Sequence, residues 1–386
     1  MHLWSSRGLW AAGLALVLAA CSSAPQRPQP TPLAPVTPAV SLAPVWQAQL
    51  GPSDGLVRMA ASGGEVAMVS SEGVLQVRVA RTGEIKWQLP LGKKILTGVG
   101  FDGKRVALVD GDNNLIIASA GKVLWQASMS ARSYALWRVP MLARSYTPPL
   151  VAGGRVFVLN AQRDVLAFDA DTGALLWRAP YTGEALVLQA PGLLAAYGNS
   201  LLVGWGERLV GLHPDTGKPY WSAALTLPRG INEIERLIDV VAGAHAAQGK
   251  LCARAFQAVV SCVDIQSGQR VWSHDSDGYS GVAGDEDVLV GTDRSGRVQA
   301  WKLSDGQSLW TQDALRYRRV TGPTMLGMSF VVGDGEGYVH WLSKTSGRVL
   351  NRMATDGSAI LSPPVLADGT LIVQTSAGGV FAWQPK

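Results

Sequence analysis

The residues Gly98–Gly103 read GVGFDG, which matches the GxGxxG pattern of dinucleotide-binding sites. A site of that kind needs a helix directly after the glycines, because the helix N-terminus faces the pyrophosphate. Here Lys104–Asp110 (KRVALVD) follows, and its alternating apolar residues predict a strand instead. We therefore interpret these glycines as a turn between two structural units and predict no dinucleotide cofactor.

Three acidic stretches carry the oxygen ligands that calcium prefers, namely Asp110–Asn114, Asp275–Gly278 and Asp334–Gly337. None of them has the DxDxDG spacing followed by a Glu at the twelfth position that a calcium-binding loop requires. Asp and Asn side chains also favour tight turns, because they hydrogen-bond to backbone amides two residues further on. We interpret all three stretches as turns and predict no metal site.

Ser273, His274 and Asp275 supply the residue types of a hydrolytic triad. Adjacent residues of a strand point to opposite faces, so these three side chains cannot meet. The remaining histidines show no metal-ligand spacing among themselves; they are His2, His213, His245 and His340. The sequence therefore predicts that the protein has no catalytic residues, binds no cofactor and is not an enzyme.

The chain contains fourteen Trp residues, a number that could indicate stacking on a quinone or a sugar. Half of them, however, occupy the closing position of one short repeat, as in DTGALLW at Asp171–Trp177 and DTGKPYW at Asp215–Trp221. The closing residues are Trp46, Trp87, Trp125, Trp177, Trp221, Trp272, Trp310 and, in a looser copy, Asn351. Steps of 38 to 52 residues between them are typical of four-stranded β-propeller blades. We expect these Trp side chains to fill the space between neighbouring blades.

Each repeat opens on a Gly followed by alternating apolar residues, which predicts two facing strands. The eight openings are Gly64, Gly103, Gly154, Gly198, Gly249, Gly284, Gly327 and Gly369. No closing strand follows the last of them, whereas Val45–Leu50 resembles a closing strand with no blade before it. The sequence therefore predicts an all-β fold, an eight-bladed β-propeller of four-stranded antiparallel blades whose N-terminal strand joins the last blade. Such closure leaves no long unpaired edge; a solenoid with open ends is the alternative.

The first residues differ in composition from the repeats. Met1–Ala20 has one Arg, a short apolar stretch and small residues before Cys21, an arrangement that resembles a bacterial lipoprotein signal peptide. The resemblance implies that Cys21 becomes the lipidated first residue. Because Ser22 follows it, the resemblance further implies a lipid anchor in the outer membrane, with the protein facing the periplasm. An ordinary cleaved signal is the alternative.

Residues 21–44 are expected to form an extended tether, because seven prolines lie between Ala24 and Pro44. About 20 residues at roughly 3.1 Å each would reach roughly 60 Å from the membrane. The propeller is expected to occupy residues 45–386 as one domain. The net charge of +5 is mild and no run of Lys or Arg stands out, so nucleic acid is not an expected partner.

Two cysteines, Cys252 and Cys262, follow Cys21 in the sequence. They flank one expected hairpin whose turn centres on Gln257, which would place them opposite each other. A cross-strand disulfide is one interpretation, since the periplasm is oxidising, and two buried free thiols are the other. The sequence leaves both open.

The DTGxxxW repeats resemble those of quinoprotein dehydrogenase propellers, which hold their quinone against an adjacent Cys–Cys pair and bind calcium through acidic ligands. The sequence has neither feature. Glu233–Val240 (EIERLIDV) and Asp334–Trp341 (DGEGYVHW), together with the lipoprotein signal and the eight repeats, resemble instead the BamB family of the outer-membrane β-barrel assembly machinery. The resemblance spans the whole propeller and implies a non-catalytic scaffold. A periplasmic enzyme that handles a quinone or a sugar is the alternative function.

In the BamB family, the propeller binds the periplasmic POTRA domains of BamA through two loops on one face; other subunits and unfolded outer-membrane proteins are further expected partners. The resemblance assigns these contacts to Leu186, Leu188 and Gln189 in one loop and to Glu235, Arg236 and Asp239 in the other. Gln189 replaces a basic residue of the family and Val241 replaces a second Asp, so two charges are lost. From the residues alone, a loop that packs on its own blade is an equal alternative. The role of Ala131–Ser145 stays open.

Overall fold

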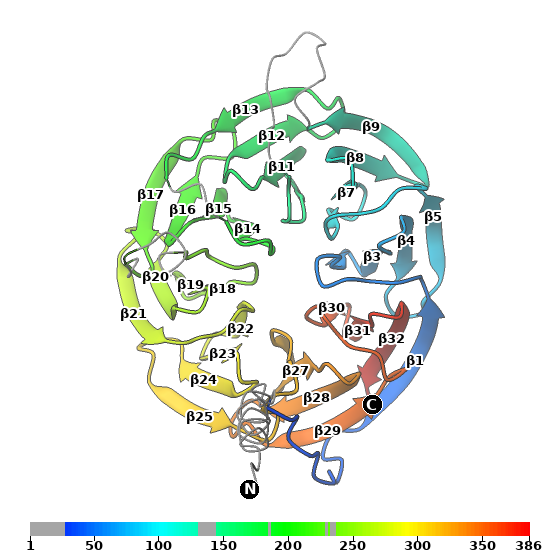
Figure 1. Cartoon of the computed structure of the whole chain (residues 1–386), viewed down its shortest axis with the longest axis vertical. Coiled ribbons are helices and arrows are strands. Elements are labelled where there is room, and N and C mark those ends of the chain that lie inside the picture. Colours follow the sequence, from blue (N-terminus) through cyan, green and yellow to red (C-terminus); the bar gives the residue numbers. More distant parts are fainter. Residues whose placement is uncertain (1–27, 130–143, 184–186, 228–230, 232–236) are drawn as a thin grey trace, which may run out of the picture.

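The computed structural model describes residues 28–129, 144–183, 187–227, 231 and 237–386. This part of the chain contains thirty-two strands in eight four-stranded antiparallel sheets, which are arranged round a ring as the blades of a propeller (Figure 1). The predicted all-β, eight-bladed fold is confirmed. No helix in these residues has the length and apolar character needed to cross a membrane.

The blades follow one another along the chain, and each runs from an inner strand to an outer one (Figure 1). Blade 1 comprises β2 (Ala60–Ser62), β3 (Glu65–Val69), β4 (Val74–Val79) and β5 (Ile85–Pro90), and blade 2 comprises β6 (Gly100–Phe101), β7 (Val106–Val109), β8 (Asn114–Ser119) and β9 (Lys122–Ser128). Blade 3 comprises β10 (Leu150–Ala152), β11 (Arg155–Leu159), β12 (Val165–Asp169) and β13 (Leu175–Ala179), and blade 4 comprises β14 (Leu194–Tyr197), β15 (Ser200–Trp205), β16 (Arg208–Leu212) and β17 (Pro219–Ala224). Blade 5 comprises β18 (His245–Ala247), β19 (Lys250–Ala255), β20 (Val259–Asp264) and β21 (Arg270–Asp275), and blade 6 comprises β22 (Val282–Gly284), β23 (Val288–Thr292), β24 (Val298–Lys302) and β25 (Ser308–Gln312). Blade 7 comprises β26 (Thr324–Leu326), β27 (Ser329–Gly333), β28 (Tyr338–Ser343) and β29 (Val349–Ala354), and blade 8 comprises β30 (Val365–Ala367), β31 (Thr370–Gln374), β32 (Gly379–Pro385) and β1 (Leu42–Gln49).

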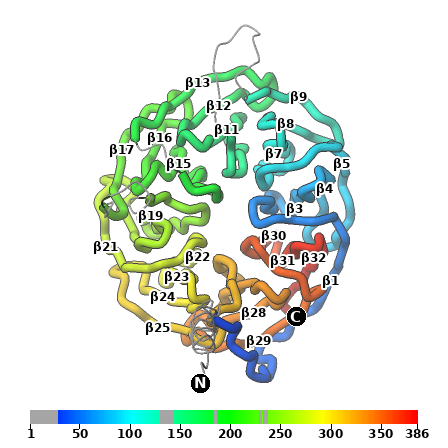
Figure 2. The backbone as a smooth tube through the Cα atoms, viewed as in Figure 1, coloured from blue at the N-terminus to red at the C-terminus, as the bar shows by residue number. Residues whose placement is uncertain are grey.

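The two ends of the chain close the ring. Blade 8 takes three strands from the C-terminal end of the chain and its outer strand, β1, from the N-terminal end. Trp46 lies opposite Ala382 and Gln49 lies opposite Gly379 in the antiparallel pairing of β1 with β32. Figure 2 shows the blue N-terminal strand beside the red C-terminal blade. The predicted closure is confirmed, and β1 begins at Leu42 rather than at Val45.

A β-bulge occurs at the same place in the outer strand of all eight blades. In blade 3, Trp177 pairs with Ala167 and Leu175 pairs with Phe168, so Leu176 is the extra residue. The other seven blades show the same register shift directly before the closing residue. Because a bulge re-aims the side chain beside it, the closing Trp turns toward the next blade. In five of the seven blades that close on a Trp, the indole N–H donates to a backbone carbonyl there: Trp46 to Ala80, Trp125 to Ala170, Trp177 to Pro214, Trp272 to Leu303 and Trp310 to Lys344.

The glycine of each closing turn receives the Trp of the preceding blade. Gly217 has a φ of +68°, which suits a residue without a Cβ. A Cβ on Gly217 would also lie 2.5 Å from the ring of Trp177. The repeat therefore needs both of its constant residues, since the Gly of one blade leaves the space that the Trp of its neighbour occupies.

The single exception to the Trp pattern lies where the ring is closed without a covalent turn. Blade 8 has no turn between its third and fourth strands, because β32 ends the chain and β1 begins it. The closing residue of blade 7 is Asn351, and its side-chain amide donates to the Val40 carbonyl at 2.8 Å. A shorter donor thus replaces the indole where the N-terminal segment occupies the position of the missing turn.

The hydrophobic core lies between neighbouring blades. One cluster joins Val69 and Val77 of blade 1 to Val106, Leu108 and Ile116 of blade 2, and all five are fully or almost fully buried. Period-two alternation places such residues on the blade faces. The core thus fixes each blade against the next, and the connections between blades are left to vary.

Candidate partner-binding face

Alternate connections of an up-and-down blade lie on alternate faces of the ring. Hairpins between second and third strands therefore share one face with the connections that lead from each blade to the next. Two of these connections are long: residues 180–193 lead from β13 to β14, and residues 225–244 lead from β17 to β18. They contain the residues that the sequence resemblance assigned to partner binding.

The structure describes three of the six assigned residues. Gln189 is exposed, whereas Leu188 and Asp239 are partly buried. The other three, Leu186, Glu235 and Arg236, lie outside the described residues, as does the lipidation candidate Cys21. The geometry of the face is therefore built from Leu188, Asp239 and their neighbours.

Backbone hydrogen bonds join the two connections to each other. Gly192 and Val241 form an isolated antiparallel bridge. The Leu193 N–H donates to the Val240 carbonyl at 3.0 Å, and the Ala242 N–H donates to the Pro191 carbonyl at 2.9 Å. The two connections therefore form one unit that spans blades 3 to 5.

A partly buried ion pair between Asp239 and Arg163 fixes this unit to the β11–β12 hairpin. Asp239, whose side chain is 15% exposed, accepts a hydrogen bond from Arg163 Nε at 2.8 Å through Oδ1 and one from the Leu188 N–H at 2.9 Å through Oδ2. Arg163 belongs to the β11–β12 hairpin, and its guanidinium carbon lies 5.1 Å from the ring centre of Tyr181. Burial raises the pKa of the Asp239 carboxyl, against the opposing effects of the Arg163 charge and the Leu188 N–H. One carboxylate thus links three segments.

The family resemblance assigned Asp239 to partner contact, and the structure shows that its carboxylate also makes a contact within the chain. Its carboxylate points toward Arg163, which lies 76 residues earlier in the sequence. Arg163 is the site residue that sequence reasoning missed. The available signal was an Arg in a hairpin turn on the face that carries both long connections, which is weak because turns often carry solvated charges.

The end of a third connection contributes to the same face. Thr147, in the segment that leads into β10, accepts a hydrogen bond from the Gly192 N–H at 3.0 Å. Thr147 and Tyr146 line a hollow of about 40 Å³ together with Leu188 and Asp239. Residues 131–143 of the unexplained Ala131–Ser145 segment lie outside the described residues. The residues that follow it nevertheless pack into the face.

Apolar and polar groups alternate on the surface of this unit. Leu237 lies between two hollows of about 450 and 930 Å³. Leu227 is 72% exposed, and Gln189 offers an exposed amide. Exposed apolar anchors beside hydrogen-bonding groups are typical of protein–protein interfaces. The face can therefore bind a protein surface without any reaction chemistry.

Comparison with known proteins gives the family. The model of the family described as outer membrane protein assembly factor BamB matches residues 40–136 and 71–312 of the chain. The chain belongs to the BamB family. It is 35% identical to the outer membrane protein assembly factor BamB of Burkholderia pseudomallei over 97% of both chains. It is 30% identical to that of Bordetella pertussis over 95% of this chain and 93% of the relative. The family resemblance noted from the sequence is confirmed.

Solved structures agree with this assignment. BamB from Moraxella catarrhalis superposes with a TM-score of 0.77 at 25% identity, covering 89% of this chain and all of that one. The quinohemoprotein alcohol dehydrogenase of Comamonas testosteroni superposes with a TM-score of 0.64 at 14% identity, covering 89% of this chain and 78% of that one. Identity that low shows a shared propeller fold and nothing about chemistry.

Two of the three acidic stretches of this BamB-family chain form turns as predicted, and for the third the prediction is wrong. Asp110 begins the β7–β8 hairpin, and its Oδ1 accepts the N–H groups of Asp112 and Asn114 at 3.0 and 2.8 Å. Asp334 accepts two backbone N–H groups in the same way in the β27–β28 hairpin. Asp275–Gly278 is not a tight turn but leads out of β21 toward blade 6. Among the residues that the structure describes, no three His, Cys, Asp or Glu side chains are grouped to hold a metal ion.

Two further sequence patterns have structural roles in this family member. Gly98–Gly103 leads from blade 1 into β6, and a Cβ on Gly100 would lie 2.0 Å from the Pro149 carbonyl oxygen of the next blade. Ser273–Asp275 forms the end of β21, where its side chains alternate between the faces of the blade. Close packing and strand geometry therefore account for both patterns.

The two cysteines of blade 5 lie directly opposite each other. Cys252 on β19 is in register with Cys262 on β20, and both side chains are fully buried. They form a disulfide in the structure. The expected turn centre, Gln257, has a left-handed φ of 48°.

Proposed function

We propose that this chain is a non-catalytic scaffold of the outer-membrane protein assembly machinery. It binds the POTRA domains of BamA and assists the folding and insertion of β-barrel proteins. A lipid on Cys21 anchors it to the outer membrane on the periplasmic side, after removal of residues 1–20. Other subunits of the complex and unfolded outer-membrane proteins are further proposed partners, and nucleic acid is not one.

The observation that carries this proposal is the unit formed by residues 187–193 and 237–244. Its two parts are joined by backbone hydrogen bonds and by the contacts of Asp239 with Arg163 and Leu188. A surface fixed in this way is already ordered before a partner arrives, so less conformational entropy is lost on binding. Membership of the BamB family supports an assembly role for a face of this kind.

The outer rim of the ring is a poorer place for a partner to bind. A POTRA sheet edge could in principle add a strand to an outer strand of the propeller. Every outer strand, however, carries a bulge directly before its closing residue, and bulges disrupt the ladder that an added strand would continue. Docking on the connections of the face is therefore favoured over strand addition at the rim.

Co-purification tests the proposal directly. The variant Leu186→Ala with Leu188→Ala removes the two apolar side chains that the family resemblance assigns to the contact. We expect it to lose co-purification with the periplasmic region of BamA while its melting temperature stays near that of the native chain. The matched control is Leu176→Ala, because Leu176 is a 47% exposed leucine at the rim of the same blade. Undiminished capture by the double variant would overturn the assignment of this face.

A further inference from the structure

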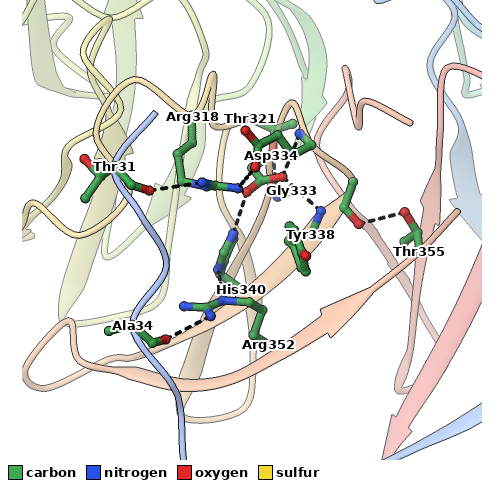
Figure 3. A network of polar contacts seen from close by, with 12 residues as sticks. Thr31, Ala34, Arg318, Thr321, Gly333, Asp334, Tyr338, His340, Arg352 and Thr355 are labelled. Carbon is green, nitrogen blue, oxygen red and sulfur yellow. Dashed lines mark hydrogen bonds and ion pairs between the residues drawn. The ribbon is translucent and has the colours of Figure 1, made fainter. Parts of the chain in front are cut away.

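The described residues that precede β1 lie along blade 7 (Figures 1 and 3). Thr31–Ser41, here called the strap, passes beside β29 and contacts blade 7 along its length. Its prolines suggested an extended segment free of the ring. The contacts instead make the strap part of the propeller surface.

The end of the strap farthest from β1 is held by backbone hydrogen bonds. The Thr31 N–H donates to the Arg316 carbonyl at 3.0 Å, and the Thr31 carbonyl accepts from Arg318 Nη1 at 3.0 Å. The Arg318 side chain is 3% exposed, donates through Nε to Asp334 at 2.8 Å and pairs with Glu336 (Figure 3). A guanidinium fixed by two carboxylates presents a preformed donor to the strap.

The middle of the strap is held by one apolar and one polar contact. Leu33 packs against the buried cluster between blades 6 and 7 that includes Phe330. Arg352 Nη1 donates to the Ala34 carbonyl at 3.0 Å, and its Nε donates to His340 Nδ1 at 3.4 Å (Figure 3). This second guanidinium is thus also positioned from within blade 7.

The end of the strap next to β1 completes the attachment. The Ala39 N–H donates to the Leu350 carbonyl at 2.8 Å, and the Asn351 amide donates to the Val40 carbonyl at 2.8 Å. On the strap side, every one of these hydrogen bonds uses a backbone group. The strap is therefore fixed from Thr31 onward, and the point at which the chain leaves the propeller is blade 7.

From this attachment, and resting on the proposed lipidation of Cys21, we infer that the blade 7 side of the ring faces the lipid surface. Ten peptide units separate Cys21 from Thr31. At ~3.1 Å per residue they reach about 31 Å, which is about half of the length expected for a free segment that ends at Pro44. So short a connection keeps Thr31, where the chain first contacts the propeller, near the bilayer.

This orientation separates the membrane from the two long connections, which lie on the same face of the ring as Arg318 and the β27–β28 hairpin but at other blades. One connection joins blades 3 and 4, nearly across the ring from the strap on blade 7, and the other joins blades 4 and 5, nearer to it (Figure 1). With blade 7 nearest the lipid, the described residues 187–193 and 237–244 lie farther from the bilayer than the strap does. A periplasmic partner can then reach them without competing with the bilayer.

Fluorescence quenching at two matched positions tests the orientation. Ala314→Cys and Thr182→Cys each place one thiol on an exposed part of an inter-blade connection, the first beside the strap and the second at the candidate face. Cys252 and Cys262 are paired and buried, so they do not compete for the label. The lipidated chain carrying a bimane label is bound to vesicles of phosphatidylethanolamine and phosphatidylglycerol that contain a nitroxide headgroup lipid.

The result expected is quenching at position 314 and none at position 182. Equal quenching at both positions, or stronger quenching at position 182, would overturn the inference while leaving the lipid anchor intact. A labelled chain that fails to float with the vesicles at all would overturn the anchor at Cys21, and the inference with it. The two failures are thus distinguishable.

A longer connection between Cys21 and the strap supplies a second test of the orientation. Insertion of twenty Gly and Ser residues before Pro28 leaves every strap contact in place and adds a flexible segment of roughly 25 Å root-mean-square length. Quenching at position 314 is expected to fall while the chain still floats with the vesicles. Undiminished quenching would contradict the idea that the short connection holds blade 7 near the lipid.

Discussion

Replacement of Arg163 by Met tests whether the candidate face is held together by one buried charge pair. Arg163 is 6% exposed and Asp239 is 15% exposed, and two of the guanidinium nitrogens lie 2.8 Å from Asp239 Oδ1. Removing one partner of a buried ion pair leaves the other charge uncompensated and costs roughly 3–5 kcal/mol. Because both side chains keep some exposure, we expect the lower value, about 3 kcal/mol.

The Leu188 amide reports this loss locally. Its N–H donates to Asp239 Oδ2, so it exchanges with solvent only when that contact opens. A destabilisation of about 3 kcal/mol corresponds to roughly a hundredfold increase in the open population. Hydrogen exchange followed by mass spectrometry, on the peptide that contains Leu188, measures it. The control is Arg155→Met, because the pair of Arg155 with Asp215 is exposed and is worth at most about 1 kcal/mol.

The effect has a defined pH dependence. Burial raises the pKa of Asp239 in the folded protein, and Arg163 opposes that rise, so the Arg163→Met variant has a still higher folded pKa. A carboxyl with a raised folded pKa favours folding below its unfolded pKa, and this contribution is lost as the pH rises through the folded pKa. The deficit of the variant is therefore expected to be small below the unfolded pKa, about pH 4, and to grow as the pH rises through the folded pKa of Asp239 in the native chain toward that in the variant.

A double-mutant cycle with Asp239→Asn decides between two roles for Arg163. If Arg163 acts by positioning Asp239, the two substitutions together destabilise by about 1.5–3 kcal/mol less than the sum of the single effects. BamA binding should weaken in parallel with the loss of Leu188 protection. Weakened binding with native protection of the Leu188 amide would refute the reasoning, because Arg163 would then contact the partner itself.

Two further predictions concern the ring. Gly217→Ala and Gly249→Ala both place a side chain at a left-handed φ, which costs roughly 1–2 kcal/mol, but only the first brings its Cβ within 2.5 Å of a Trp ring. In thermal unfolding the first is expected to be clearly less stable than the second, and equal values would contradict the docking of Trp177 on Gly217. In the denatured, unreduced chain Cys252 and Cys262 are expected not to react with a thiol probe. Replacing both by Ala is expected to cost about 3 kcal/mol of stability, and labelling without a reductant would show that the disulfide is not formed.

The sequence predicted the ring well because the fold repeats its own signature. A Gly at a left-handed turn and a Trp after the bulge recur in successive blades, so eight copies of one local pattern predicted eight blades. Asn351, the one departure, also had a structural meaning, since it lies where the ring closes without a covalent turn. Local patterns of this kind are visible without knowing which blades are neighbours.

The strap and the inward direction of Asp239 were not predictable in that way. The strap is held through backbone groups such as the carbonyls of Thr31 and Ala34, which leave no trace in side-chain types, and its donors Arg318 and Arg352 lie near the other end of the chain. A Pro-rich composition therefore suggested a free segment. Asp239 depends likewise on a distant partner, Arg163 of blade 3, which no local sequence pattern identifies.

The two faces of the ring are under different constraints, and this difference supports the proposed location of the partner-binding site. The turns between third and fourth strands must keep their Gly, because the Trp of the neighbouring blade lies against it, as Trp177 lies against Gly217. A longer turn there would displace that Trp and open the space between blades. On the opposite face the repeated contact is one backbone hydrogen bond from a hairpin to the connection before its blade, as from the Gly111 N–H to the Lys94 carbonyl and from the Gly335 N–H to the Arg318 carbonyl. This bond fixes one point of the connection, so the rest of the connection can lengthen without loosening the ring. The described parts of the two long connections, residues 187–193 and 237–244, are on that face. The Arg163–Asp239 pair holds them together despite the length of the connections.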